Sequence, residues 1–382
     1  MKTKQLCLLF VSVFAGAIIF SSCKKNFPLG SGCLCNCSPG DLVATTSVYA
    51  SGLNLPRGLK FGPDGSLYVA EAGVGGTNTT TNSSCMQVPA PIGPYSGSDT
   101  GSRISKIWNG QRITVADKLP SSMDAQGDIM GVADVAFIGN TIYGVLAGAG
   151  CSHGVPTIPN GVVKVLPNKK WKMVADLSAF IQANPVANPN AGDFEPDGTW
   201  YSMQAVGNDL YAVEPNHGEI DKIDQRGHIS RLIDISATQG HIVPTSIIFH
   251  DGSFYMVNLS HFPITGNSNV YKITLQGKIT TVASGFSMAQ GIAFDEEGGI
   301  YVLEGTTNNP FPTPGTGAVV RIDPSGVRTT ILSGLNFPTA MIMGPDNKLY
   351  ISNWGFGPPL VGNGQILQVS ISCPKQTSGK LY

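Results

Sequence analysis

The chain has 382 residues, of which 13% are charged, and its formal net charge is −1 with histidine counted as neutral. Without an excess of Lys and Arg there is no basic field to neutralise phosphates, so we do not expect nucleic-acid binding. The low charge, the 47 glycines and the 26 prolines instead predict many short strands joined by tight turns.

The first 22 residues read as an export signal. Lys2 and Lys4 precede an apolar run from Leu6 to Phe20, which is too short to span a bilayer. The segment Phe20-Ser21-Ser22-Cys23 resembles a bacterial lipobox, with Phe20 where Leu is more usual. An ordinary secretory signal followed by an incidental Cys is the alternative.

This interpretation divides the chain into four parts. We expect a lipoprotein signal peptide over 1–22, a lipidated Cys23 with a flexible spacer over 23–41, a folded domain over 42–372 and a short tail over 373–382. The lipid would anchor an exported protein to a bacterial membrane, facing the periplasm or the cell surface.

Six cysteines remain after the signal and the lipidation site, and an even number in an oxidising compartment favours disulfides. They are Cys33, Cys35, Cys37, Cys85, Cys151 and Cys373. Cys85 and Cys151 lie in two insertions that should share a face, so we expect them to bond. We expect Cys373 to pair with one of the three clustered cysteines, although a C-x-C-x-C run can also bind metal.

The folded part repeats one pattern six times: an apolar strand, a Gly/Asp turn, and a second strand that contains a tyrosine. These marker tyrosines are Tyr68, Tyr143, Tyr211, Tyr255, Tyr301 and Tyr350. A third strand follows in every copy and a fourth in five copies. Six repeats of four antiparallel strands predict an all-β, six-bladed β-propeller, rather than a β-sandwich or two smaller β domains.

The sixth copy lacks its fourth strand, and the segment around Val48 matches the missing element. We therefore expect the N-terminal strand to complete the last blade and close the ring, which would remove an exposed sheet edge.

Several segments carry a family resemblance. VPTSIIFHDGSFYMVNLSHFP from Val243, GPDGSLYVAEAG from Gly62 and SGLNFPTAMIMGPDNKLYISNWG from Ser333 resemble NHL-type repeats and, more closely, the ScyD/ScyE family of propellers. The resemblance covers roughly Val48 to Val369, and the third repeat, with DGTWYS and VEPNHG, departs from the family pattern. It implies the fold and export, and no particular reaction.

Every long insertion falls on the same face of the predicted ring, where strand two ends and strand one begins, and such loops usually carry binding. Polar side chains at these positions make the candidate ligand or metal face: Arg57, Glu71, Asp134, Glu214, Asn258, Glu304 and Asn353. Their oxygens suit a hard cation such as calcium. The alternative is that they are polar strand ends, with Arg57 paired to Glu71.

Aromatic and histidine residues recur in the same loops and predict the rim of a pocket. They are His217, His261, Phe262, Phe311, Trp354 and Phe356. They would line an apolar pocket or, alternatively, pack the loops down.

Two classes of function compete. No nucleophile elbow and no catalytic set can be assigned by spacing, which favours a monomeric, membrane-anchored propeller that binds a small molecule or a partner protein. The alternative is a lactonase-like hydrolase with calcium near the central channel, but Pro56-Arg57-Gly58 places a cation where such enzymes present oxygen ligands. A quinone-dependent dehydrogenase is a third reading, for which no catalytic His or basic cofactor clamp can be placed.

Overall fold

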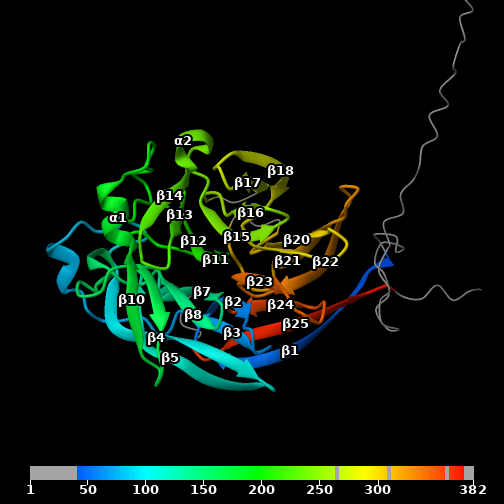
Figure 1. Ribbon diagram of the computed structural model, residues 1–382, viewed down its shortest axis with the longest axis horizontal. Helices are drawn as coiled ribbons and strands as arrows, with labels where there is room; N and C mark the ends of the chain where they lie inside the picture. The colour runs from blue at the N-terminus through cyan, green and yellow to red at the C-terminus, as the bar shows by residue number, and fades with distance from the viewer. Residues whose placement is uncertain (1–40, 263–265, 308–310, 358–360, 374–382) are drawn as a thin grey trace, which may run out of the picture.

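The computed structural model describes residues 41–262, 266–307, 311–357 and 361–373. These residues form six antiparallel sheets, and the first strand of each sheet contacts the first strand of the next. The contacts run from β2 (Pro56–Phe61) through β7, β11, β15 and β19 to β23 and back to β2. This closed ring confirms the predicted six-bladed propeller (Figure 1).

Five blades begin at the axis and are built outward in chain order, and blade 6 takes its outer strand from the N-terminus. Blade 1 holds β2, β3 (Leu67–Glu71), β4 (Ser96–Trp108) and β5 (Gln111–Met123), with a short fifth strand β6 (Ile129–Met130). Blade 2 holds β7 (Val132–Ile138), β8 (Thr141–Leu146), β9 (Gly161–Val165) and β10 (Trp171–Asp176). Blade 3 holds β11 (Ser202–Val206), β12 (Asp209–Glu214), β13 (Glu219–Ile223) and β14 (Ile229–Asp234).

The second half repeats the arrangement. Blade 4 holds β15 (Pro244–His250), β16 (Ser253–Asn258), β17 (Ser268–Thr274) and β18 (Ile279–Phe286). Blade 5 holds β19 (Ala289–Phe294), β20 (Ile300–Glu304), β21 (Gly317–Ile322) and β22 (Arg328–Leu335). Blade 6 holds β23 (Ala340–Met343), β24 (Leu349–Asn353), β25 (Gly364–Ser372) and, as its outer strand, β1 (Val43–Leu53).

The two ends of the folded domain meet in blade 6. β1 pairs antiparallel with β25 from Val43 opposite Ser372 to Leu53 opposite Gly364, with two bulges, and the two strands lie side by side in Figure 1, blue against red. This is the predicted closure, and it leaves β1 rather than β25 as the outer edge of the blade. Cys33, Cys35 and Cys37, the predicted partners of Cys373, lie outside the described residues.

Marker tyrosines pack between neighbouring blades. Tyr68 packs edge-on against Phe137 of the next blade, with ring centroids 4.9 Å apart, and Tyr350 packs in the same way against Phe61. The Tyr68 hydroxyl donates to Asp64 at 3.1 Å, in the turn that precedes its own strand. The Tyr350 hydroxyl donates to Asp346 in the same way, at 3.1 Å. These two rings therefore supply apolar contact between blades while their hydroxyls keep a partner.

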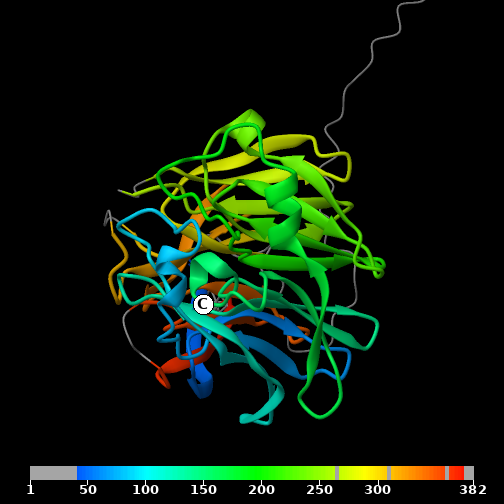
Figure 2. The same ribbon diagram turned by 90° about the vertical axis from the view of Figure 1, so that its left-hand side faces the viewer.

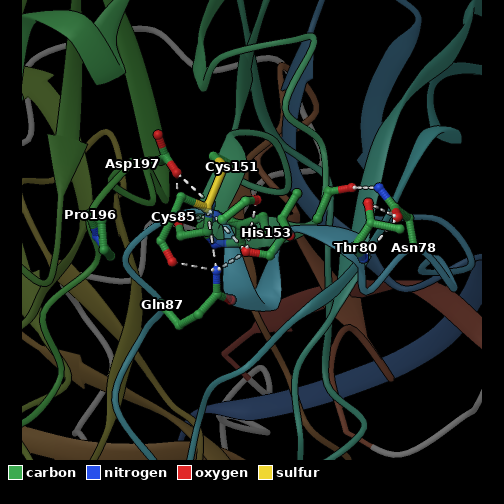
Figure 3. The surroundings of a disulfide bond; sticks show 12 residues. Asn78, Thr80, Cys85, Gln87, Cys151, His153, Pro196 and Asp197 are labelled. Carbon is green, nitrogen blue, oxygen red and sulfur yellow. Dashed lines mark hydrogen bonds between the residues drawn. A yellow bond between two sulfur atoms is a disulfide. The ribbon is translucent and has the colours of Figure 1, made fainter.

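Short helices lie outside the blades. They are η3 (Thr80–Ser83), η4 (Cys151–His153), α1 (Leu177–Ala183) and α2 (Ser236–Gln239). None of the helices in the described part of the chain combines the length and apolar character that a membrane span needs. The loops that carry η3 and η4 lie together (Figure 2), and the disulfide Cys85–Cys151 joins them (Figure 3), as predicted.

Candidate functional site

A cavity of about 1000 Å³ opens at the axis, on the face where strand one of each blade begins. Residues from the first strands of all six blades contribute to its wall, including Arg57, Asp134, Ser202, Thr245, Gln290 and Ala340. The long loops that connect strands two and three, and those that connect successive blades, raise the wall further. The decorated face predicted from the insertions is therefore also the hollow face.

One side of this wall is polar and comes from blades 1 to 3. Arg57 donates to the backbone oxygen of Ile129 at 2.6 Å and forms an ion pair with Asp128 at 3.3 Å. Glu195 accepts a hydrogen bond from the hydroxyl of Tyr95 at 3.2 Å. We call the cavity-lining members of this group the polar wall: Arg57, Tyr95, Asp124, Asp128, Asp193, Glu195 and Tyr201.

The other side is apolar and comes from blades 4 to 6. Phe262 and Phe311 stack with ring centroids 5.7 Å apart, and Phe337 packs against Phe356 at 4.7 Å. We call these four rings, with Met288, the aromatic wall. A cavity with one apolar side and a few convergent polar groups is the usual form of a small-molecule site.

Histidines lie at the boundary between the two walls. His241 Nε2 is 2.8 Å from Asp193 Oδ2, and the imidazole of His261 stacks on that of His241 with centroids 6.2 Å apart. Of the predicted rim residues, His261, Phe262, Phe311 and Phe356 line the cavity. The other two do not: His217 is buried against Phe194, and Trp354 packs on Phe337.

Burial changes the acidity of the cavity carboxyl groups. It raises the pKa of Asp134 to about 6, although Lys60 nearby and the backbone amide of Met203, which donates at 2.8 Å, favour its charged form. Burial and the neighbouring Asp128 raise the pKa of Asp124 to about 6 as well. Shifts of this direction show that negative charge in the cavity is poorly solvated.

Five of the predicted ligand residues have a different role from the one their oxygens suggested. Glu71, Glu214, Glu304 and Asn353 each accept a hydrogen bond from a backbone amide just before strand one of their own blade. Asn258 donates instead, to the oxygen of Ile242 at 2.8 Å. We call these five side chains the blade clasps.

The blade clasps hold a strained turn. In four blades the residue that follows the clasped one is not glycine and yet has a positive φ: Leu55 at 53°, Val243 at 55°, Met288 at 50° and Phe337 at 42°. Bulky residues rarely adopt this conformation, which costs free energy that the surroundings must offset. Three of these four, Val243, Met288 and Phe337, line the cavity. The clasps therefore shape the cavity wall by holding these residues, although the clasps themselves do not line it.

The calcium hypothesis does not fit this geometry. None of the blade clasps lines the cavity, and each is committed to its own blade. The alternative pair also differs from expectation, because Glu71 binds Arg103 at 2.7 Å while Arg57 binds Asp128. Within the described ranges, no group of three or more His, Cys, Asp or Glu side chains is arranged to hold a metal ion.

The sequence reasoning found Arg57 and Asp134 but missed most of the polar wall. Asp193 and Glu195 lie in an insertion without strand periodicity, and His241 lies in the connection before β15. An acidic cluster in the long insertion, DFEPD from Asp193, was the only signal available. Tyr95 lies just before β4, in the loop that the disulfide holds.

Comparisons with known proteins support the fold alone. No protein-family model and no curated protein sequence matches the chain. A protein of unknown function from Bacteroides thetaiotaomicron is similar in structure, with a TM-score of 0.55 and 13% identity over 87% of this chain and 76% of the other. A gluconolactonase from Xanthomonas campestris aligns with a TM-score of 0.53 and 8% identity over 86% of this chain and 90% of its own.

Proposed function

We propose that this protein is an exported, lipid-anchored propeller that binds a small organic molecule in its axial cavity. The observation that carries the proposal is the cavity itself: about 1000 Å³, bounded by the polar wall on one side and the aromatic wall on the other. Its volume lies at the upper end of the range for small-molecule sites.

The enclosure of the site favours a small molecule over a partner protein. The lining residues sit at the starts of the innermost strands, such as Gly58, Ser246 and Ala340, where only a compact ligand reaches. The exposed rings are confined to the mouth, where Phe262 and Phe311 keep 48% and 58% of their surface accessible. Solvent-exposed aromatic side chains at a cavity mouth are expected to lose this surface when a ligand binds.

Export and family membership are part of the same proposal. The lysines and apolar run of residues 1–22, with the lipobox-like segment ending at Cys23, support lipidation and anchoring to a bacterial membrane. The internal disulfide is consistent with an oxidising compartment. The resemblance of the repeats to the ScyD/ScyE family supports membership of that group, and we expect a monomer.

Binding can be tested with aromatic fragments and a variant that fills the cavity. Ser246 lies on β15 and lines the cavity, so Ser246→Trp should remove room for a ligand. Ser284 lies exposed on β18, the outer strand of the same blade, so Ser284→Trp is the matched control. We expect saturation-transfer NMR on the full chain to detect indole, phenol or phenethyl alcohol with the control variant but not with Ser246→Trp. The same signals in both variants, or none in the unmodified chain, would refute binding in the cavity.

A further inference from the structure

The cavity carries more acid than base. Five carboxylic acids line it, Asp124, Asp128, Asp134, Asp193 and Glu195, against the two basic side chains Arg57 and Lys60. Burial lowers the pKa of Lys60, so it counts for less than a full positive charge. Arg57 is committed to Asp128 by the ion pair at 3.3 Å. Lys60 acts on Asp134, whose charged form it favours. Three acids of the polar wall are left without a permanent counter-charge from the cavity lining.

Glu195 is one of the acids that lack a positively charged partner. It is 3% exposed, and its Oε2 accepts no hydrogen bond from the described residues. The nearest basic atom is His153 Nε2 at 3.4 Å, but burial lowers the pKa of His153 to about 4, so this ring is neutral at pH 7. Burial and the carboxylates of Glu214 and Asp193 raise the pKa of Glu195 well above its usual value. A cation placed beside Glu195 would favour its charged form and pair with it.

Asp193 and Gln290 also line the cavity with polar atoms that have no hydrogen-bond partner in the described part of the chain. Asp193 uses Oδ2 on His241, while its Oδ1 is buried without a hydrogen-bond partner among the described residues. Gln290 is 9% exposed and lines the cavity, and its amide makes no hydrogen bond within the described part of the chain. The Gln290 amide therefore faces the cavity with its hydrogen-bonding capacity open to a ligand.

The aromatic wall fits the same kind of ligand. The rings of Phe262, Phe311, Phe337 and Phe356 offer apolar surface for a hydrocarbon part and electron-rich faces for a positive charge. An anion would instead lie beside acidic side chains and would further disfavour their charged forms. A bare divalent cation would need a cluster of three or more ligands, which the described residues do not provide.

We propose that the cavity selects a small organic cation, an ammonium group carried on an apolar or aromatic body. The ammonium lies against Asp193 and Glu195, and the apolar body lies against the aromatic wall. This inference rests on the proposed binding function and adds to it the charge of the ligand.

Three probes that share one aromatic ring separate the possibilities: phenethylamine, phenethyl alcohol and phenylacetate. We expect calorimetric titration of the full chain to show phenethylamine binding about tenfold more tightly than the alcohol, because a hydrogen bond to a charged group is worth more than a neutral one. Phenylacetate should bind most weakly. Equal affinity for amine and alcohol, tighter binding of phenylacetate, or no binding of any of the three would overturn the inference.

Variants then locate the charge. Asp193→Asn should lower the affinity for phenethylamine about tenfold and leave that for phenethyl alcohol unchanged, which also shows that the variant is folded. Asp251 is 86% exposed in the β15–β16 turn on the opposite face, so Asp251→Asn is the matched control and should change neither. Gln290→Lys should reverse the preference towards phenylacetate. An unchanged preference in both cavity variants would contradict the assignment.

The two proposals fail differently. If the fragments bind in the cavity and Ser246→Trp abolishes their binding, the cavity is a binding site whatever the order of the three probes. If that order shows no preference for the amine, only the assignment of a cationic ligand is lost.

Discussion

Glu214 is a blade clasp whose charge has no counter-ion. Its side chain is fully buried and accepts the backbone amides of Thr199, at 2.9 Å, and of His217. Burial is the largest cause that raises its pKa, from 4.5 to about 8. By contrast, Glu71 at the equivalent position of blade 1 binds Arg103 at 2.7 Å.

The sign of the pH dependence follows from this shift. A carboxyl group whose pKa is higher in the folded state binds its proton more tightly there, so its contribution to stability is greatest below pH 4.5. That contribution is lost as the pH rises from 4.5 to about 8. At about 1.4 kcal/mol per unit, the loss from Glu214 between pH 5 and pH 8 is about 3 kcal/mol.

Glu214→Gln removes the charge and keeps one acceptor oxygen. At pH 5 we expect the variant to be less stable than the unmodified chain by about 1 kcal/mol, because one accepted hydrogen bond is lost. At pH 8 we expect it to be more stable by about 2 kcal/mol, because the buried charge is gone. Urea denaturation at a series of pH values, followed by tryptophan fluorescence, measures the difference.

Glu71→Gln is the control, since it removes the partner of Arg103. It should destabilise the fold at both pH values by about 1–3 kcal/mol. A stability difference between Glu214→Gln and the unmodified chain that stays constant from pH 5 to pH 8 would show that Glu214 carries no suppressed charge, and the reasoning would fail.

Two further predictions concern the walls of the cavity. The Cys85–Cys151 disulfide closes a loop with a sequence separation of 66, so replacing both cysteines by serine should lower the free energy of unfolding by about 4 kcal/mol. Chemical denaturation measures this loss. A loss well below about 1 kcal/mol would show that the disulfide contributes little to the stability of the fold. At Gly58, an added Cβ would lie 2.0 Å from Asp134 Oδ1. Gly58→Ala should therefore cost about 1–3 kcal/mol and weaken fragment binding. Gly65→Ala lies in a far-face turn with φ +76°, so it should also cost stability but leave binding unchanged.

The architecture could be predicted because each blade repeats the same local sequence pattern. Alternating apolar residues, a turn and a tyrosine recur six times, and the missing outer strand of blade 6 identified β1. The Cys85–Cys151 pair followed from two insertions that share a face. Each of these inferences needs only the period of the repeat and the direction of each strand.

The site could not be predicted in the same way. The position of Glu71, Glu214 and Glu304 after the marker tyrosine was read correctly, but position alone does not show whether an oxygen faces the axis or its own backbone. Asp193, in the connection from blade 2 to blade 3, reaches His241, in the connection from blade 3 to blade 4. This contact depends on the path of a long irregular insertion. Such paths are set by tertiary packing, which no repeat period encodes.

The seam between β1 and β25 also determines how the domain can be tethered. β25 leaves the cavity-side loop at Gly364 and runs nine residues to Ser372, opposite Val43, a length of about 30 Å. Both termini of the folded domain therefore emerge at the base of the ring, remote from the opening. A lipid at Cys23, or a tag fused to either end, would attach on the side of the ring opposite the cavity and leave the cavity opening accessible to solvent.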